Sequence, residues 1–181
     1  MKAFVVYESM FGNTHEIAEA IAEGLDSLGE VELGSVAHVA PEAVADAELL
    51  VIGGPTHMHG MSRPTSRSAA AEAAATDDEL EMEPDATGPG LREWFSRMPK
   101  TGAGRLAAAF DTRLDKPALL TGSAAKGIAK QLRRHRYEAL GEPESFLVED
   151  SNGPLMEGER ERARRWGAQL ADRCRALDAA E

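Results

Sequence analysis

Short apolar runs alternate with longer segments of helical period along most of this chain, and no other feature restricts the fold as strongly. The alternation is typical of a parallel sheet wrapped by helices, in which each strand is covered on both faces. We therefore predict strands at residues 3–7, 31–36, 49–52, 106–110 and 145–148, with the second strand at an edge of the sheet.

Apolar residues at spacings of three and four predict the helices between these strands. After the first strand they run from Ile17 to Leu28. Asn13 followed by Glu16 resembles a capping box, which places the start of this helix at Asn13 or Thr14. Further helices are predicted at 66–75, at 91–98, at 123–135, and along a C-terminal apolar stripe from Ala163 to Leu177. This stripe places Cys174 on the core side, so we expect a buried structural thiol.

The connection between the third and fourth strands is unusually long and contains an acidic stretch, residues 77–85. Such a stretch is predicted to be a solvated surface loop, and a docking site for a partner is the alternative. Because it lies inside the connectivity of the sheet, we interpret residues 76–90 as an insertion in a single domain that spans residues 1–181.

The charge balance and the lengths of the apolar runs argue against several classes of protein. The chain has 20 basic and 31 acidic residues and a formal net charge of −11, which disfavours a nucleic-acid partner. No apolar run approaches the roughly 20 residues that cross a bilayer, and the N-terminal run is too short for a signal peptide. We therefore expect a cytoplasmic protein without a membrane or nucleic-acid partner, acting as a monomer or homodimer.

The segment after the first predicted strand combines polar side chains with a glycine. A loop that leaves a parallel strand and opens into a helix presents free backbone N–H groups and the positive end of the helix dipole. Ser9, Asn13 and Thr14 add side-chain donors, and Gly12 allows the backbone to close around an anion. The P-loop and dinucleotide fingerprints are absent. The segment therefore suits a phosphate group, and an ordinary helix cap is the alternative.

The pattern Val5-Val6-Tyr7-x-Ser9-x-x-Gly12-x-Thr14-x-x-x-Ala18-x-x-Ile21 is similar, position by position, to the phosphate-loop signature of the flavodoxin family. The order of elements resembles that family over nearly the whole chain, and the acidic insertion is the main departure. The resemblance implies a doubly wound, three-layer α/β sandwich with a five-stranded parallel sheet in the order 2-1-3-4-5. It also implies one FMN, bound non-covalently at the carboxyl ends of the strands.

The resemblance implies cofactor-binding residues in three segments. They are Ser9, Met10, Phe11, Gly12, Asn13 and Thr14 at the phosphate, Pro55, Thr56, His57, Met58, His59 and Gly60 on one side of the flavin ring, and Phe110, Asp111, Thr112 and Arg113 on the other. The peptide between His59 and Gly60 is expected to reorient towards the flavin N5 on reduction, because glycine accepts backbone angles that a Cβ would penalise. Family members usually stack an aromatic ring near this glycine, whereas this chain has His59.

Simpler structural interpretations exist for several of these residues. Asp111 and Arg113 could form only a surface ion pair. His15, His57 and His59 would lie near the same rim, which suggests a metal site, but no second cluster of ligand-like spacing accompanies them.

A second segment, residues 121–126, resembles another anion site, with an ordinary Ser123 helix cap as the simpler interpretation. The helix that it opens has a basic cluster, formed by Lys126, Lys130, Arg133, Arg134 and Arg136. This cluster is expected to be a solvated face, or else to dock an acidic partner or a nucleotide phosphate.

Two functional classes follow from the resemblance. The favoured one is an electron carrier that passes electrons between a reductase and an acceptor, because no separate nicotinamide-binding signature is visible. The alternative is an FMN-dependent NAD(P)H:quinone-type oxidoreductase, in which the long crossover at residues 61–105 would help to form a substrate pocket. A third interpretation is a family member that has lost the flavin and acts as a binding module. The net negative charge is expected to lower the reduction potential of a bound flavin.

Overall fold

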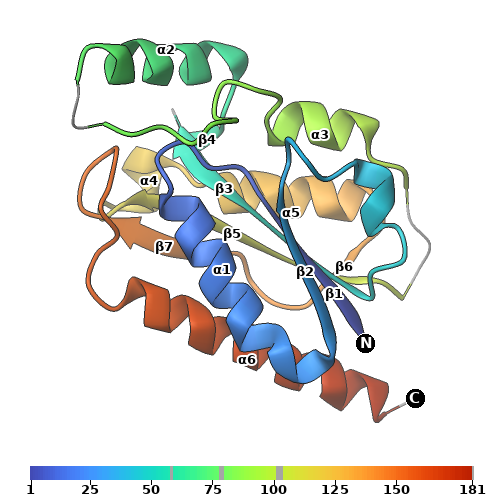
Figure 1. Cartoon of the computed structure of the whole chain (residues 1–181). Coiled ribbons are helices and arrows are strands. Elements are labelled where there is room, and N and C mark those ends of the chain that lie inside the picture. Colours follow the sequence, from blue (N-terminus) through green and yellow to red (C-terminus); the bar gives the residue numbers. More distant parts are fainter. Residues whose placement is uncertain (58, 78–79, 101–103, 181) are drawn as a thin grey trace.

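Parallel strands of mostly apolar sequence form the centre of the molecule (Figure 1). The computed structural model describes residues 1–57, 59–77, 80–100 and 104–180. The main strands are β1 (Lys2–Tyr7), β2 (Glu30–Ser35), β3 (Leu49–His57), β5 (Leu106–Leu114) and β7 (Glu144–Val148). They pair in parallel in the order β2-β1-β3-β5-β7, which confirms the predicted order, including the edge position of the second strand.

Two short strands complete the sheet. β6 (Glu138–Ala139) pairs with the first residues of β5, and β7 pairs with the last residues, so these two segments share the position beyond β5. β4 (Gly60–Met61) turns back antiparallel on the end of β3. The carboxyl end of β3 is therefore a hairpin rather than an open loop.

Helices cover both faces of the sheet (Figure 1). α1 (Asn13–Leu25) and α6 (Glu159–Asp178) lie on one face, and α3 (Leu91–Arg97) and α5 (Ala124–Arg134) lie on the other. The remaining helices are α2 (Pro64–Ala75), α4 (Ala118–Thr121) and the 3-10 turns η1 (Asp26–Leu28) and η2 (Pro41–Val44). Among the described residues, no helix combines the length and the apolar character needed to cross a membrane.

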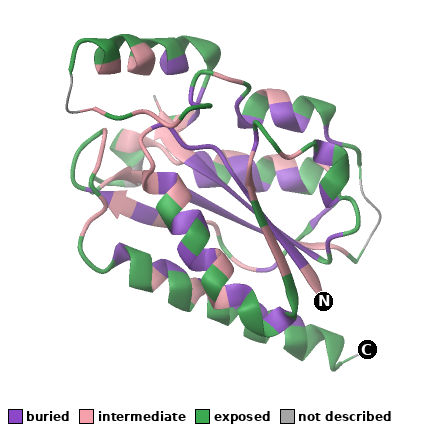
Figure 2. Ribbon diagram, in the orientation of Figure 1, coloured by how far each residue is buried: buried purple, intermediate pink, exposed green. Residues whose placement is uncertain are grey.

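A hydrophobic core fills the space between the sheet and each helical layer (Figure 2). The residues from Leu49 to Ile52 are fully buried, as expected for a strand covered on both faces. Cys174 is fully buried against α1 and the sheet, which confirms the prediction for this thiol. Burial, with a contribution from Glu48, raises the pKa of Cys174 to about 11.

The structure corrects two details of the predicted elements. β3 and β5 extend beyond their apolar runs, because backbone pairing continues as far as Pro55 and Thr112. α1 does begin at Asn13, but Asn13 is not its cap, because the cap residue is Gly12 and the Asn13 side chain instead donates to the Asn152 carbonyl at 3.0 Å. The predicted cap of α5 is confirmed, since Ser123 Oγ accepts from the Lys126 N–H.

The acidic insertion is not simply a solvated loop. The Glu83 carboxylate lies 2.9 Å from His15, and that of Asp85 lies 3.3 Å from His38. The Glu83 N–H also donates to the Met10 carbonyl at 2.8 Å. Residues 83–85 therefore pack against the segment that follows β1, whereas residues 78–79 lie outside the described part of the chain.

Candidate functional site

A cavity of about 590 Å³ lies at the carboxyl ends of β1, β3, β5 and β7, and we call it the cleft. Ligands of open α/β sheets bind at this edge, where the strand order reverses. Its described lining residues are Ser9, Met10, Phe11, Asn13, Thr14, Pro55, Thr56, His57, His59, Thr112, Arg113, Leu114, Lys116, Leu120, Thr121, Val148 and Ser151. The three segments singled out from the sequence thus meet around one cavity.

Not every predicted residue presents its side chain to the cleft. Phe110 is fully buried in the core, edge-on to Phe146 and Trp166, and Asp111 is fully buried on the side of α5. Thr112 and Arg113, nearer the carboxyl end of β5, do line the cleft. Gly12 and Gly60 belong to the segments but not to the lining, and Met58 lies outside the described residues.

The loop between β1 and α1 has the geometry of an anion site. The first intrahelical bond of α1 runs from the Glu16 N–H to the Gly12 carbonyl, so the preceding N–H groups, those of Asn13, Thr14 and His15, have no acceptor within the helix. Gly12 has a φ of +86°, which a side chain would strain, and its N–H donates to Ser9 Oγ. This turn sits at the positive end of the α1 dipole.

A buried pair of hydroxyl groups joins this loop to β5. Thr14 Oγ1 lies 2.7 Å from Thr112 Oγ1, and both residues are buried. The Thr14 hydroxyl, which the sequence suggested as a phosphate donor, therefore already has a protein partner. Its first role is to hold two walls of the cleft together.

The hairpin at the end of β3 packs tightly against the entrance to α5. His59 adopts a φ of +72° and forms a β-bridge with Gly122. A Cβ at Gly122 would lie 2.2 Å from the His59 carbonyl oxygen, so only glycine allows this approach. The carbonyl of the His59–Gly60 peptide is thus packed against protein, while the His59 side chain is exposed at the cleft.

Asp111 connects the hairpin to α5. Its Oδ2 atom accepts hydrogen bonds from Thr56 Oγ1 (2.9 Å), Ser123 Oγ (2.7 Å) and the Ala125 N–H (2.9 Å). Thr56 Oγ1 in turn accepts from the Ala124 N–H at 2.8 Å. The suggested surface ion pair with Arg113 is therefore wrong, because Asp111 is fully buried and Arg113 donates to the carbonyls of Leu114 and Lys116.

The local charge of the cleft differs from that of the whole chain. Its described lining includes the cations Arg113 and Lys116 and no carboxylate. Because nearby charges act most strongly, the lining favours an anionic ligand in spite of the net charge of −11. The net charge therefore does not describe the field inside the cleft, and the effect on a flavin potential stays a prediction.

The histidines separate into two environments. His57 and His59 line the cleft, whereas His15 stacks on Tyr7 at a centroid distance of 4.6 Å and pairs with Glu83. Burial lowers the pKa of His57 and so favours its neutral imidazole, an effect that Glu8 opposes and Arg67 reinforces. Within the described residues, no three His, Cys, Asp or Glu side chains are arranged to hold a metal ion.

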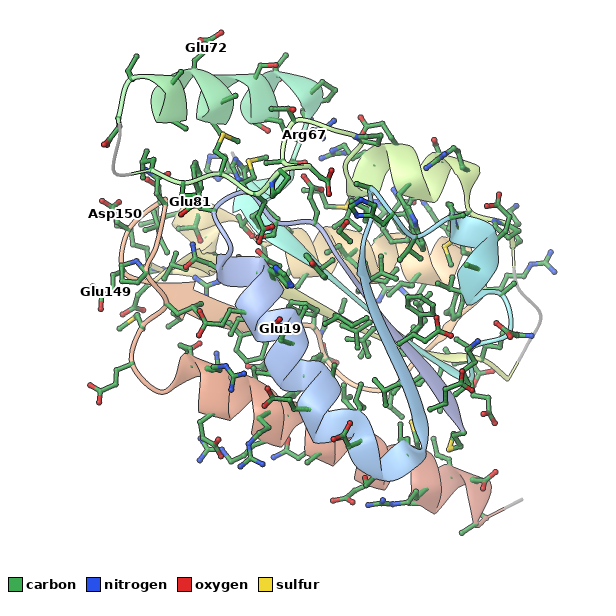
Figure 3. The ribbon with its side chains drawn as sticks, in the orientation of Figure 1. Glu19, Arg67, Glu72, Glu81, Glu149 and Asp150 are labelled. Carbon is green, nitrogen blue, oxygen red and sulfur yellow. The ribbon has the colours of Figure 1, made fainter. Side chains whose placement is uncertain are left out.

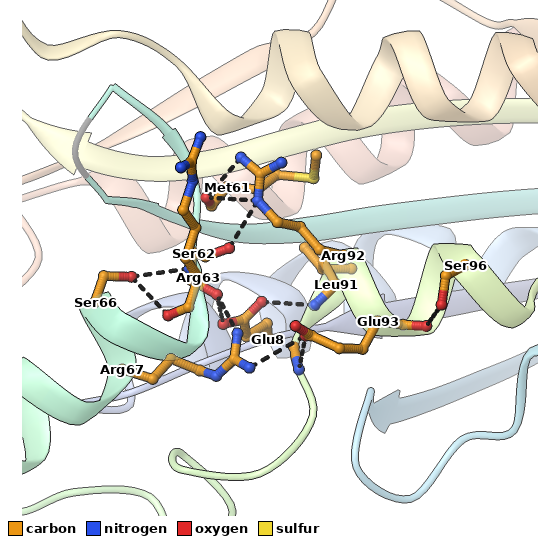
Figure 4. A network of polar contacts seen from close by, with 11 residues as sticks. Glu8, Met61, Ser62, Arg63, Ser66, Arg67, Leu91, Arg92, Glu93 and Ser96 are labelled. Carbon is orange, nitrogen blue, oxygen red and sulfur yellow. Dashed lines mark hydrogen bonds and ion pairs between the residues drawn. The ribbon is translucent and has the colours of Figure 1, made fainter.

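Sequence reasoning missed a buried polar network beside the cleft (Figure 4). The Glu8 carboxylate accepts from Ser62 Oγ and from the Leu91 N–H (2.8 Å), which anchors the start of α3 to the end of β1. Arg67 donates to Ser62 Oγ (3.0 Å) and to Glu93 (3.1 Å). In Figure 3, Arg67 lies on the inner side of α2, whereas Glu72 points away from the sheet.

Some of the missed residues could have been found from their positions in the sequence. Glu8 directly follows an apolar strand at the edge where parallel strands place functional groups. In the same way, Val148 ends the fifth predicted strand and Ser151 follows it. Arg67 gave no such signal. A second cavity, of about 380 Å³, lies beside the network between the end of β2 and residues 83–89.

Comparison with known proteins finds one matching protein family and solved structures of the same fold. The family model described as Flavodoxin matches residues 5–115. Similar solved structures include a flavodoxin from the domain Archaea (22% identity, 97% of this chain and 99% of that chain, TM-score 0.62) and Flavodoxin 2 from Bacillus cereus (18%, 95% and 99%, 0.64). A WrbA-like protein from Agrobacterium tumefaciens is also similar (20%, 97% and 98%, 0.56). At these identities the structures show a common fold, and no curated protein matches the sequence.

Proposed function

The chain belongs to the flavodoxin family, and on that premise we propose that its cleft binds FMN non-covalently and that the protein carries electrons between a reductase and an acceptor. The observation that supports this most strongly is the meeting of three loops around one cavity, with the N–H groups that have no acceptor within α1 at one end. Its volume of about 590 Å³ lies within the range of small-molecule and cofactor sites.

The donors in the cleft fit an anionic cofactor. Backbone N–H groups at the start of α1 would hold the phosphate, with Ser9 and Asn13 beside them. The hairpin of β3 and β4 and the residues Thr112 and Arg113 would flank the ring. When bound, FMN supplies the one- and two-electron chemistry, and these residues position it and control access to it.

One observation favours a carrier over an enzyme. An FMN-dependent NAD(P)H:quinone-type oxidoreductase needs a pocket for its substrate above the ring, and the long crossover was the candidate wall. Among the described residues between 60 and 111, none lines the cleft. The Glu8 network instead ties this crossover to β1 beside the second cavity.

Titration of the apoprotein with FMN and with riboflavin tests the proposal. FMN is expected to bind with quenched flavin fluorescence, and more tightly than riboflavin, because only FMN contains the phosphate. A protein that stays colourless and binds neither flavin would refute the proposal and favour the flavin-free module. Rapid two-electron reduction by NAD(P)H, followed by turnover of a quinone, would instead support the enzyme.

The chain offers a matched pair of variants for the phosphate end. Gly12 and Gly158 precede α1 and α6 with φ values of +86° and +83°, and neither has a close neighbour that a Cβ would displace. Alanine at either position adds about 1–2 kcal/mol of backbone strain. We expect Gly12→Ala to weaken FMN about 5- to 30-fold as the loop relaxes away from the binding geometry, and Gly158→Ala to leave it unchanged. Equal effects of the two variants would place the phosphate elsewhere.

A further inference from the structure

The outer face of α5 is uniformly cationic. Ala125, Ile128 and Leu132 are among the residues that bury its inner face. Its outer face and the turn that follows present the exposed residues Lys126, Lys130, Arg133, Arg134 and Arg136, which we call the α5 basic face. Residues 116–137 contain six basic and no acidic residues, in a chain with a net charge of −11.

These cations lack the partners that other cations in the molecule have. On α6, four arginines pair with carboxylates, namely Arg160, Arg162, Arg164 and Arg175. In the part of the chain that the structure describes, no carboxylate lies within ion-pair distance of the α5 basic face. Lys126, Lys130 and Arg134 also follow one another at spacings of four, where like charges destabilise a helix. An anionic partner would remove this repulsion.

An exposed apolar patch adjoins the α5 basic face. Leu119 and Leu120 of α4 are 94% and 65% exposed, and Leu120 also lines the mouth of the cleft. Gly122 and Ser123 alone separate α4 from α5. An apolar centre beside a charged rim is the usual anatomy of a protein–protein interface, whereas phosphate backbones offer nothing to cover two leucines.

We propose that α4 and the α5 basic face form a docking surface for an acidic protein. Carboxylates of the partner would contact the cations, and its apolar side chains would cover Leu119 and Leu120. Contact at Leu120 brings the partner to the mouth of the cleft. This docking needs no cofactor; only an exchange of electrons at the docked surface would rest on the proposed function.

Binding to two forms of one probe protein tests the docking surface. Native cytochrome c is basic, and its succinylated form presents carboxylates in place of the lysines. At low ionic strength, calorimetric titration is expected to show salt-sensitive binding of the succinylated form. Binding is expected to be the same with and without FMN, so that a failure to bind FMN does not affect this result.

Paired variants separate the α5 basic face from net charge. Lys130→Gln with Arg134→Gln should weaken binding about fivefold. Arg164→Gln with Arg165→Gln makes the same charge change on α6, at the opposite face of the sheet, and should change binding less than twofold.

Four outcomes would overturn the proposal. The first is an absence of binding to the succinylated probe, and the second is equal or tighter binding of the native form. The third is an equal effect of the two double variants, which would show that only net charge acts. The fourth is tighter binding of another partner to the α5 basic face than of the succinylated probe. That partner would be either a 20-nucleotide single-stranded DNA or a second copy of the chain, and self-association would be measured by sedimentation velocity.

Discussion

The Thr56 hydroxyl joins the cleft hairpin to both β5 and α5. It donates to Asp111 Oδ2 at 2.9 Å and accepts from the Ala124 N–H at 2.8 Å. Thr56→Val keeps the shape of the side chain and removes both hydrogen bonds. Asp111 then loses one of its donors, and the first turn of α5 is left with an unpaired N–H group.

The cost of Thr56→Val can be worked from these two bonds. A neutral hydrogen bond contributes about 1 kcal/mol, and a bond to a charged group contributes about 1.5–3 kcal/mol. Thr56 is half-buried, so water replaces part of the loss. We expect the free energy of unfolding to fall by about 2 kcal/mol. For a chain of this size, that corresponds to a decrease of about 1 M in the urea midpoint.

Equilibrium unfolding of the apoprotein in urea, followed by tryptophan fluorescence, measures this change. Thr65→Val is the matched control, because Thr65 is exposed on α2 and its side chain makes no hydrogen bond to any described residue. The control should lose less than 0.5 kcal/mol. A loss from Thr56→Val that is equally small would refute the role assigned to the Asp111 bonds. FMN should also bind more weakly to Thr56→Val, since the hairpin is no longer fixed.

Three further measurements test the electrostatics of the molecule. The pKa of His57 is lowered from 6.5 in the folded protein. Below pH 6.5, His57 is therefore protonated to a greater extent in the unfolded chain than in the folded one. The free energy of unfolding should therefore fall as the pH drops from 7 to 5, and His57→Gln should flatten this slope; parallel slopes would contradict the assignment. Lys116→Gln removes a cation from the cleft lining and should lower the potential of bound FMN by something on the order of tens of millivolts. Lys100→Gln, outside that lining, should leave the potential unchanged. Cys174, whose pKa is raised to about 11, should resist iodoacetamide at pH 8 and react in urea, and rapid labelling of the folded protein would show that the thiol is exposed.

The sequence predicted the sheet well because its signal is local. Four of the five predicted strands lie within observed ones, and the second differs only at Val36, one residue beyond the end of β2. α1, α2, α3 and α5 begin within two residues of their predicted starts at positions 13, 66, 91 and 123, and α6 begins four residues before the predicted stripe. The ends of β3 and β5 escaped prediction because residues 53–57 and 111–113 are glycine, proline or polar, although the backbone pairing continues through them as far as Pro55 and Thr112. The apolar runs therefore mark less than the buried part of each strand, because Gly53, Gly54, Asp111 and Thr112 are buried as well.

The site was predictable in its location but not in its internal bonds. Three loops at one sheet edge follow from the strand order, so their meeting could be foreseen. The partners of Glu8 lie 54 and 83 positions away along the chain, at Ser62 and Leu91, and periodicity contains no information on such pairs. For the same reason, Asp111 was placed beside the ring, although the alternation along β5 turns it towards α5.

The hydrogen bond between the Glu83 N–H and the Met10 carbonyl has a thermodynamic consequence. It makes the acidic insertion and the loop before α1 parts of one coupled equilibrium. Any ligand that favours the present shape of the loop must also favour the closed position of residues 83–85, and by reciprocity any contact that opens those residues weakens that ligand by the same factor. Residues 83–85, which lie outside the cleft, would thus contribute to the affinity for a ligand bound inside it.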